Sequence, residues 1–166
     1  MKKIIFLVVL IYLIMLLISR DPLITDDIHP QKSCPELIEK SDVLYVTPLL
    51  KGDSLLNYQE WCTKMRALNK TYGLHGITHN YHEFLEPISK EDFEEAIDIF
   101  EGCFGYKPEL FRPPYNKISV DNQELVESYG MSVYDTTYIL HPYCHCQTSS
   151  WMSLLNGIIF CSVKGI

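Results

Sequence analysis

Two histidines, His75 and His79, stand four residues apart in the segment His-Gly-Ile-Thr-His. Neutral imidazole is a common metal ligand, and two imidazoles at this spacing can share one divalent ion. A helix is a poor host for the pair, because the glycines and β-branched residues around it weaken helices. We therefore expect a short strand from Leu74 that opens into a loop. Packed or solvated histidines are the alternative, so the metal hypothesis depends on other segments.

Two adjacent carboxylates, Asp26 and Asp27, end a short extended stretch of the chain. They offer a third metal ligand and a base. Side chains alternate along a strand, so neighbouring aspartates face one site only where the strand is ending. The alternative is a solvated acidic turn closed by Pro30.

A third segment, Phe-Arg112-Pro-Pro-Tyr115, is rigid. Each proline fixes its own φ and restricts the residue before it. The segment can therefore hold an arginine and a backbone N–H in fixed positions.

The elements that must position these residues alternate between strands and helices. The sequence predicts strands over 42–48 and 131–134 and helices over 55–68 and 121–129. A further helix is predicted from a capping box at Ser89 to Gly105. One more apolar run lies at 158–160. Such alternation favours a parallel sheet, whose working residues gather at the carboxyl ends of the strands. Both aspartates, both histidines, Arg112 and Asp135 fall at such ends. We therefore count Asp135 among the candidate catalytic residues.

The size and charge of the chain limit its class. Its 166 residues suffice for one domain with a sizeable core. The net charge is −7, and it becomes −9 without Lys2 and Lys3. The sequence has no stripe of basic residues that could bind along a phosphate backbone, so nucleic acid is not expected as a partner.

An apolar run over residues 4–19, preceded by Lys2 and Lys3, is typical of a targeting segment. As a helix it would span about 24 Å, between a signal-peptide core and a full membrane span. No small-residue cleavage site follows it. We therefore predict a signal anchor, or transmembrane helix, over 1–20, and one domain over 21–166 on the extracytoplasmic side of the cell membrane. Secretion after cleavage is the alternative.

Six cysteines in an exported chain allow up to three disulfides and fifteen pairings. Cys144 and Cys146 are separated by one residue, so a bond between them would close a strained ring. We expect each to pair with a distant partner. For the cluster of His141, Cys144, His145 and Cys146 we expect a disulfide or plain packing, and a second metal site is the alternative. A further hypothesis for the whole chain is a zinc-stapled or disulfide-stapled surface protein centred on Cys144-His145-Cys146.

Three motifs in order make residues 23–135 resemble the polysaccharide deacetylase family with the NodB homology domain. Ile24-Thr-Asp-Asp27 is similar to its Thr-Phe-Asp-Asp motif, His75-Gly-Ile-Thr-His79 to its His-Ser/Thr-x-x-His motif, and Phe111-Arg-Pro-Pro-Tyr115 to its third motif. The resemblance implies an α/β fold, a distorted and incomplete (β/α) barrel. It also implies that Asp27, His75 and His79 hold a divalent metal. Zinc suits two nitrogens and one oxygen best, and cobalt, nickel or iron are alternatives.

The same resemblance implies roles for the remaining residues. Asp26 would be the general base, Arg112 would orient Asp26, and the backbone N–H of Tyr115 would line the oxyanion site. This set suits hydrolysis of an acetamide. A metal with open positions binds and acidifies water, a carboxylate takes the proton, and donors already in place stabilise the oxyanion.

The sequence departs from the family at several points. Ile24-Thr25 replaces Thr-Phe, and Gly76 stands where the family usually has serine or threonine; we expect both changes to be tolerated. The late Leu-x-His motif that supplies a general acid has no clear counterpart, because Leu140-His141 comes too soon after Asp135. We predict a membrane-tethered, metal-dependent N-deacetylase whose partner is an extracytoplasmic amino-sugar polymer. The alternative is a catalytically silent glycan-binding or structural module on the same fold.

Overall fold

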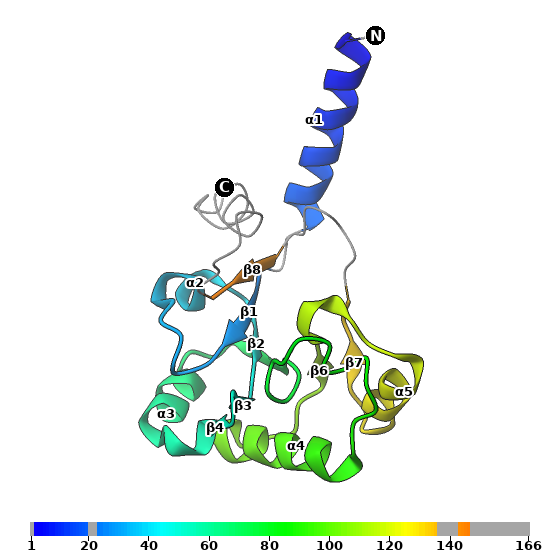
Figure 1. Ribbon diagram of the computed structural model, residues 1–166. Helices are drawn as coiled ribbons and strands as arrows, with labels where there is room; N and C mark the ends of the chain where they lie inside the picture. The colour runs from blue at the N-terminus through cyan, green and yellow to red at the C-terminus, as the bar shows by residue number, and fades with distance from the viewer. Residues whose placement is uncertain (1, 20–22, 136–142, 147–166) are drawn as a thin grey trace.

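The computed structural model describes residues 2–19, 23–135 and 143–146. Its centre is a six-stranded parallel sheet in the order β7-β6-β5-β2-β1-β8 (Figure 1). The strands are β1 (Ile24–Ile28), β2 (Val43–Val46), β5 (Thr71–Leu74), β6 (Leu110–Phe111), β7 (Ser132–Val133) and β8 (Tyr143–His145). In the chain, β2 and β5 are separated by a small antiparallel pair outside this sheet, β3 (Leu49–Leu50) and β4 (Asp53–Ser54). Because the six strands are parallel, their carboxyl ends meet at one edge of the sheet.

Helices connect the strands of the sheet. They are α2 (Pro35–Lys40), α3 (Gln59–Ala67), α4 (Lys90–Phe104) and α5 (Val120–Ser128), with short 3-10 turns η1 (Leu55–Asn57) and η2 (Pro114–Asn116). α3 packs against α4 along the lower side of Figure 1, and α5 packs against β7. The alternation expected from the sequence is thus present, and it is the reason that the strands run parallel.

α4 begins and ends where its sequence predicts. The Ser89 hydroxyl accepts a hydrogen bond from the backbone N–H of Asp92 at 3.0 Å, which satisfies a free donor of the first turn. Gly105 ends the helix in a left-handed conformation, with φ of 83°. The buried face of α4 packs into the core of the molecule, and it consists of Phe93, Ala96, Ile97, Ile99, Phe100, Cys103 and Phe104.

Most other predicted elements are present with shifted ends. The strand predicted over 42–48 is β2, the helix over 121–129 is α5, and the strand over 131–134 shortens to β7. The helix predicted over 55–68 divides into η1 and α3. The patterns do not predict α2 or the β3–β4 pair, because these elements are too short to show a periodicity. The apolar run at 158–160 lies outside the described residues.

β1 contains a bulge that the sequence does not reveal. Thr25 pairs with Leu44 and Ile28 pairs with Val46, so β1 has one more residue than β2 over this interval. Asp27 takes a left-handed conformation there, with φ of 63°. A bulge interrupts the strict alternation of side chains. The two aspartates therefore face one region from inside β1, and not because the strand is ending.

The sheet stays open over the described part of the chain. β7 and β8 are its two edges, and each pairs with one neighbouring strand there. The fold is therefore the α/β fold with a parallel sheet that the resemblance implies, and it is incomplete as a barrel.

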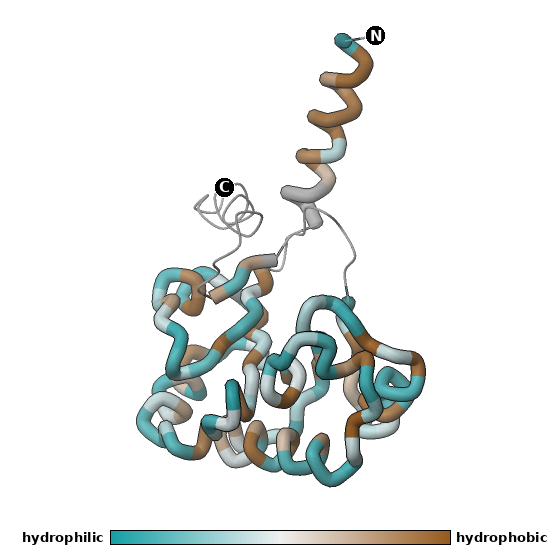
Figure 2. Tube along the Cα trace, in the orientation of Figure 1, coloured by the Kyte–Doolittle hydropathy of each residue, from teal (hydrophilic) through white to brown (hydrophobic). Residues whose placement is uncertain are grey.

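The N-terminal apolar run forms α1 (Lys2–Ser19). Figure 2 shows hydrophobic residues along most of the part of α1 that it colours. Among the described residues, no helix combines the length and the apolar character needed to cross a membrane. The prediction of a transmembrane helix is thus not confirmed.

Disulfides join segments that are distant in the sequence. Cys34 pairs with Cys146, and Cys62 pairs with Cys103. Cys144 is also disulfide-bonded, so no described cysteine is free. The prediction that Cys146 pairs with a distant partner is confirmed, because 112 positions separate it from Cys34.

Candidate metal centre and active site

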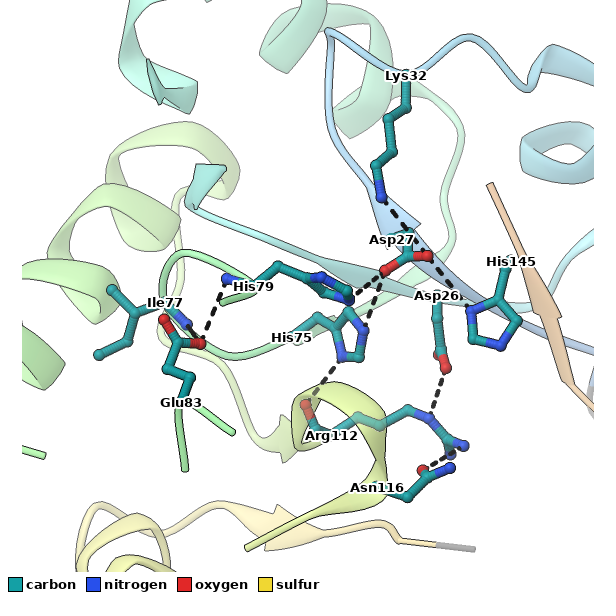
Figure 3. Close-up of polar contacts among 10 residues, drawn as sticks. All are labelled: Asp26, Asp27, Lys32, His75, Ile77, His79, Glu83, Arg112, Asn116 and His145. Carbon is teal, nitrogen blue, oxygen red and sulfur yellow. Dashed lines mark hydrogen bonds and ion pairs between the residues drawn. The ribbon is translucent and has the colours of Figure 1, made fainter. Parts of the chain in front are cut away.

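Three side chains from two segments converge at the carboxyl ends of β1 and β5 (Figure 3). Oδ1 of Asp27 is 2.6 Å from Nε2 of His79 and 3.4 Å from Nε2 of His75. One ligand atom from each residue lies within 4.8 Å of the others. The structure therefore brings together the three residues that the sequence predicts as metal ligands.

The donor atoms of this cluster fit a divalent cation. Nδ1 of His75 lies 2.9 Å from the backbone carbonyl oxygen of Arg112. A carbonyl only accepts, so Nδ1 of His75 carries a proton, and in the neutral ring Nε2 presents its lone pair toward Asp27. Oδ1 of Asp27 is buried, and its neighbours are Nε2 of His79 at 2.6 Å and Nε2 of His75 at 3.4 Å. Two neutral imidazole nitrogens and a carboxylate oxygen this close together suit a shared divalent cation.

The charge on Asp27 also suits a metal ligand. Burial by itself raises the pKa of this carboxyl, but contacts with the imidazoles of His145, His75 and His79 lower it more. The net pKa lies well below the ordinary value, so Asp27 is ionised at neutral pH. Lys32 adds a positive charge, with Nζ 3.5 Å from Oδ2 of Asp27. An ionised carboxylate is the form that binds a metal.

Glu83 fixes the loop that carries the two histidines. Its carboxylate accepts hydrogen bonds from the backbone N–H groups of Ile77 at 3.0 Å, Thr78 at 2.7 Å and His79 at 3.3 Å. The hydroxyl of Thr78 donates to the same carboxylate. Glu83 thus holds the backbone around a candidate ligand without facing the cluster itself (Figure 3).

Gly76 shows why this loop departs from the family motif. Its φ is 64°, a left-handed conformation that glycine adopts easily. A side chain at this position would collide with the ring of Pro114 and the carboxylate of Glu83. Serine or threonine is therefore excluded here by packing. Asp27 and His79 share the left-handed backbone, with φ of 63° and 64°, and such strain gathers at functional sites.

Asp26 and Arg112 form a buried ion pair beside the cluster. Nε of Arg112 donates to Oδ2 of Asp26 at 2.7 Å, and the two side chains are 0% and 1% exposed. The guanidinium carbon lies 5.0 Å from the ring centre of Tyr134 and 5.9 Å from that of Tyr45. Nη2 of Arg112 donates to Oδ1 of Asn116 at 2.9 Å. These contacts hold the Asp26 carboxylate in one orientation.

The second oxygen of Asp26 is left as an acceptor. Oδ1 is buried, and no group in the described part of the protein donates a hydrogen bond to it. An unpaired buried acceptor costs free energy, so its presence points to a function. The two aspartates thus differ in environment: Asp27 faces imidazoles, and Asp26 is held by arginine with one oxygen unused.

The structure places the other two predicted catalytic residues differently. The ring of Tyr115 lies 5.1 Å from the ring of His79, so Tyr115 borders the cluster. Asp135 follows β7, and its side chain is exposed. The residue of this segment that contacts Arg112 is Tyr134. Asp135 is therefore not brought into the site.

His145 belongs to the cluster although the sequence patterns do not assign it there. β8 pairs with β1 in parallel and places His145 opposite Asp26. Nδ1 of His145 is 3.3 Å from Oδ2 of Asp27. Burial lowers the pKa of His145, but the carboxylates of Asp27 and Asp26 raise it more, and the net pKa lies above its ordinary value. The two carboxylates thus stabilise a positive charge on the His145 ring.

A sequence signal for His145 exists. Tyr143-Cys144-His145 has the spacing of a Leu-x-His motif, with tyrosine in place of leucine. The flanking cysteines direct attention to a disulfide or zinc site instead. The proposed second metal site at Cys144-His145-Cys146 is wrong, because both cysteines are disulfide-bonded and a disulfide sulfur is no thiolate ligand. His141 lies outside the described residues.

Sequence comparison assigns the chain to a family. Residues 34–134 match the sequence profile of the polysaccharide deacetylase family, which is more than half of the chain. This chain therefore belongs to the polysaccharide deacetylase family. A search of curated protein sequences gave no match.

Solved structures of related proteins share this fold. A polysaccharide deacetylase from Bacillus cereus is 18% identical, over 69% of this chain and 59% of its own, with a TM-score of 0.55. The peptidoglycan deacetylase PdaC from Bacillus subtilis is 20% identical, over 82% of this chain and 80% of its own, with a TM-score of 0.54. A family 4 carbohydrate esterase pseudoenzyme from Bacillus anthracis is 14% identical, over 82% of this chain and 58% of its own, with a TM-score of 0.56. This chain thus spans less than two thirds of the first and third structures.

Proposed function

We propose that this protein is a metal-dependent hydrolase that removes N-acetyl groups from an amino-sugar polymer. The observation that carries the proposal is the pairing of a candidate ligand cluster, Asp27 with two histidines, with a second carboxylate, Asp26, whose Oδ1 has no partner among the described residues. Membership of the polysaccharide deacetylase family supports the reaction. The similarity to a peptidoglycan deacetylase supports a glycan substrate.

Asp27, His75 and His79 would hold the ion, and zinc suits two nitrogens and one oxygen best, with cobalt, nickel or iron as alternatives. When bound, a divalent ion lowers the pKa of a water molecule and stabilises developing negative charge. Three protein ligands are typical of a catalytic zinc site, which keeps a position open for water, whereas a structural zinc site has four.

The remaining residues handle the protons and the oxyanion. Oδ1 of Asp26 accepts a proton from the water that attacks the acetamide carbonyl carbon, and Arg112 keeps that oxygen in position. The backbone N–H of Tyr115 donates to the oxyanion. The His145 imidazolium donates its proton to the amine nitrogen as the C–N bond breaks, and acetate and the free amine result.

Removal of the metal is expected to abolish turnover. Acetate release from N-acetylglucosamine oligomers should fall to background after dialysis against a chelator and return when Zn²⁺ or Co²⁺ is added. The same addition should raise the Tm of the chelated protein, because the ligand cluster exists only in the folded state. Acetate release that a chelator leaves unchanged would contradict the metal dependence.

A catalytically silent glycan-binding module is the second candidate. The observation that favours it is the fold similarity to a pseudoenzyme from Bacillus anthracis. The two candidates differ in one measurement. Oligomer binding without acetate release, in protein carrying a full equivalent of metal, would decide for the silent module.

Loss of the Cys34–Cys146 disulfide is expected to reduce turnover. This bond ties the chain directly after His145 to the segment before α2, and β8 itself has only three residues. The double change Cys34→Ser with Cys146→Ser should cost about 5 kcal/mol in the chain-entropy model. It should also lower kcat on the order of 10²-fold, because His145 loses its fixed position. Acetate release from the folded fraction gives kcat.

The Cys62–Cys103 disulfide provides the matched control. It joins α3 to α4, away from the ligand cluster, and spans 41 positions. The change Cys62→Ser with Cys103→Ser should cost about 4 kcal/mol in the same chain-entropy model. The kcat of its folded fraction should match the unmodified protein. Equal losses of kcat in the two double variants would show that the disulfide near His145 acts only through stability.

We also propose an extracytoplasmic location with the N-terminal segment as anchor. The disulfides support it, because such bonds persist in oxidising compartments. Lys2 and Lys3 before the apolar run support an orientation with the N-terminus inside. Sequencing of the mature N-terminus tests the anchor: a start near Arg20 would mean a secreted protein.

A further inference from the structure

Two exposed tyrosines and a partly exposed histidine form an aromatic cluster next to the candidate metal ligands. Tyr81 is 69% exposed and Tyr115 is 49% exposed. The ring of His82 stacks on that of Tyr81, with centroids 3.7 Å apart and planes at 26°. Tyr81 meets Tyr115 edge-on, with centroids 5.1 Å apart and planes at 83°. We call Tyr81, His82 and Tyr115 the aromatic platform.

The aromatic platform is continuous with the ligand cluster. The Tyr115 ring lies 5.1 Å from that of His79, and the Tyr81 ring lies one further step of 5.1 Å away. Tyr115 therefore borders the place where an acetamide would be hydrolysed, and it links that place to the rings of Tyr81 and His82. A ligand that contacts the cluster and all three rings covers several side chains, which suits an oligosaccharide.

The loop of the platform is fixed before any ligand binds. Phe84 is 1% exposed and anchors the loop in the core, and the Glu83 carboxylate holds the histidine segment. The backbone N–H of Leu85 donates to the carbonyl of His82 at 2.9 Å. His82 has a φ of 62°, an unusual conformation for a residue with a side chain. Glu83 and Phe84 thus hold the loop that carries the rings of Tyr81 and His82. A loop already in place loses less entropy when a ligand binds.

The chemistry of the platform suits a sugar ring. Tyrosine offers a rigid apolar face and a hydroxyl with few rotatable bonds, so it binds amphipathic surfaces at low entropic cost. A pyranose ring has such a surface, with C–H groups on its faces and hydroxyls at its edge. An exposed aromatic cluster next to a site also marks a ligand surface in general.

We propose that the aromatic platform is an accessory subsite that stacks against a sugar adjoining the one that loses its acetyl group. The protein then prefers oligosaccharides to short substrates. This inference rests on the proposed function, because it assumes that the ligand cluster holds an N-acetylated sugar.

Equilibrium binding of β-1,4-linked N-acetylglucosamine oligomers to the full chain tests the platform. Calorimetry should show a lower Kd for the tetrasaccharide than for the disaccharide. Tyr81→Ala should raise the Kd of the tetrasaccharide about tenfold and reduce this preference, because the stacking face is removed. Tyr81→Phe should retain most of the affinity, since it keeps the ring.

Tyr106→Ala is the matched control, because Tyr106 is a half-exposed tyrosine whose ring contacts Phe100 and Phe104 of α4. It should bind both oligomers as the unmodified protein does. Tyr81→Ala should keep its metal stoichiometry and its Tm, which a purely structural role of Tyr81 would change. An unchanged tetrasaccharide Kd in Tyr81→Ala, or an equal loss for both oligomers, overturns the platform.

Acetate release measured on the same samples separates the two proposals. Binding that depends on Tyr81 without any acetate release would refute the deacetylase and leave the platform. Acetate release with a Kd that does not respond to Tyr81→Ala would refute the platform and leave the deacetylase.

Discussion

Asp26→Asn is expected to lower the rate of acetate release by about 10²–10⁴-fold while the metal stays bound. The asparagine amide can still accept the hydrogen bond that Arg112 donates to Oδ2 of Asp26 at 2.7 Å. It cannot take a proton from water, so the buried Oδ1 acceptor is lost as a base. Acetate release gives the rate, and metal analysis of the same sample gives the number of ions bound per protein.

Asp27→Asn is the matched comparison, because it changes the next residue in the same way. Asp27 faces two imidazole nitrogens at 2.6 and 3.4 Å. A neutral amide binds a divalent ion more weakly than a carboxylate does, so this variant should lose metal. Equal metal loss in both variants would contradict the division of roles. No effect in either would mean that the two aspartates form only a solvated or structural pair.

Stability must be followed in Asp26→Asn. Arg112 is fully buried, and the change removes its negatively charged partner. A buried charge that loses its partner costs about 3–5 kcal/mol. The rate should therefore be measured well below the Tm of the variant. A rate that recovers fully when the folded fraction is taken into account would show that Asp26 acts only on stability.

His145→Ala is expected to lower acetate release from N-acetylglucosamine oligomers by about 10²–10⁴-fold. The amine is a poor leaving group unless its nitrogen is protonated. His145 lies opposite Asp26 on the neighbouring strand, and the carboxylates of Asp27 and Asp26 raise its pKa. An aryl acetate ester has a leaving group that needs no proton. Its hydrolysis should therefore change much less in the same variant.

The two substrates make this test specific. A misplaced metal ligand would slow both the amide and the ester, because both reactions need the attacking water. His79→Ala supplies that comparison, since His79 is a candidate ligand at 2.6 Å from Asp27. If His145→Ala slows the ester as much as the amide, His145 positions Asp27 and does not donate the proton.

Short-range sequence patterns predicted the cluster of Asp27, His75 and His79 as candidate ligands, and most of the helices and strands. The residues around His75 and His79 predicted a short strand from Leu74 that opens into a loop. The loop is present, but β5 ends at Leu74 instead of beginning there. The sequence also predicted both ends of α4, with Ser89 as the N-cap and Gly105 as the C-cap. These features depend on interactions between residues close in the chain, such as capping and backbone conformational preference.

Contacts between segments distant in the sequence complete the candidate site. The bulge in β1 turns Asp26 and Asp27 toward one region, and it is visible only in the register with β2. The pairing of β8 with β1 brings His145 to Asp27, whereas the side chain of Asp135 after β7 is exposed. Sequence periodicity states which face a side chain takes, but not which strand lies beside it. That neighbour is set by long-range packing and, for β8, by the Cys34–Cys146 bond across 112 positions.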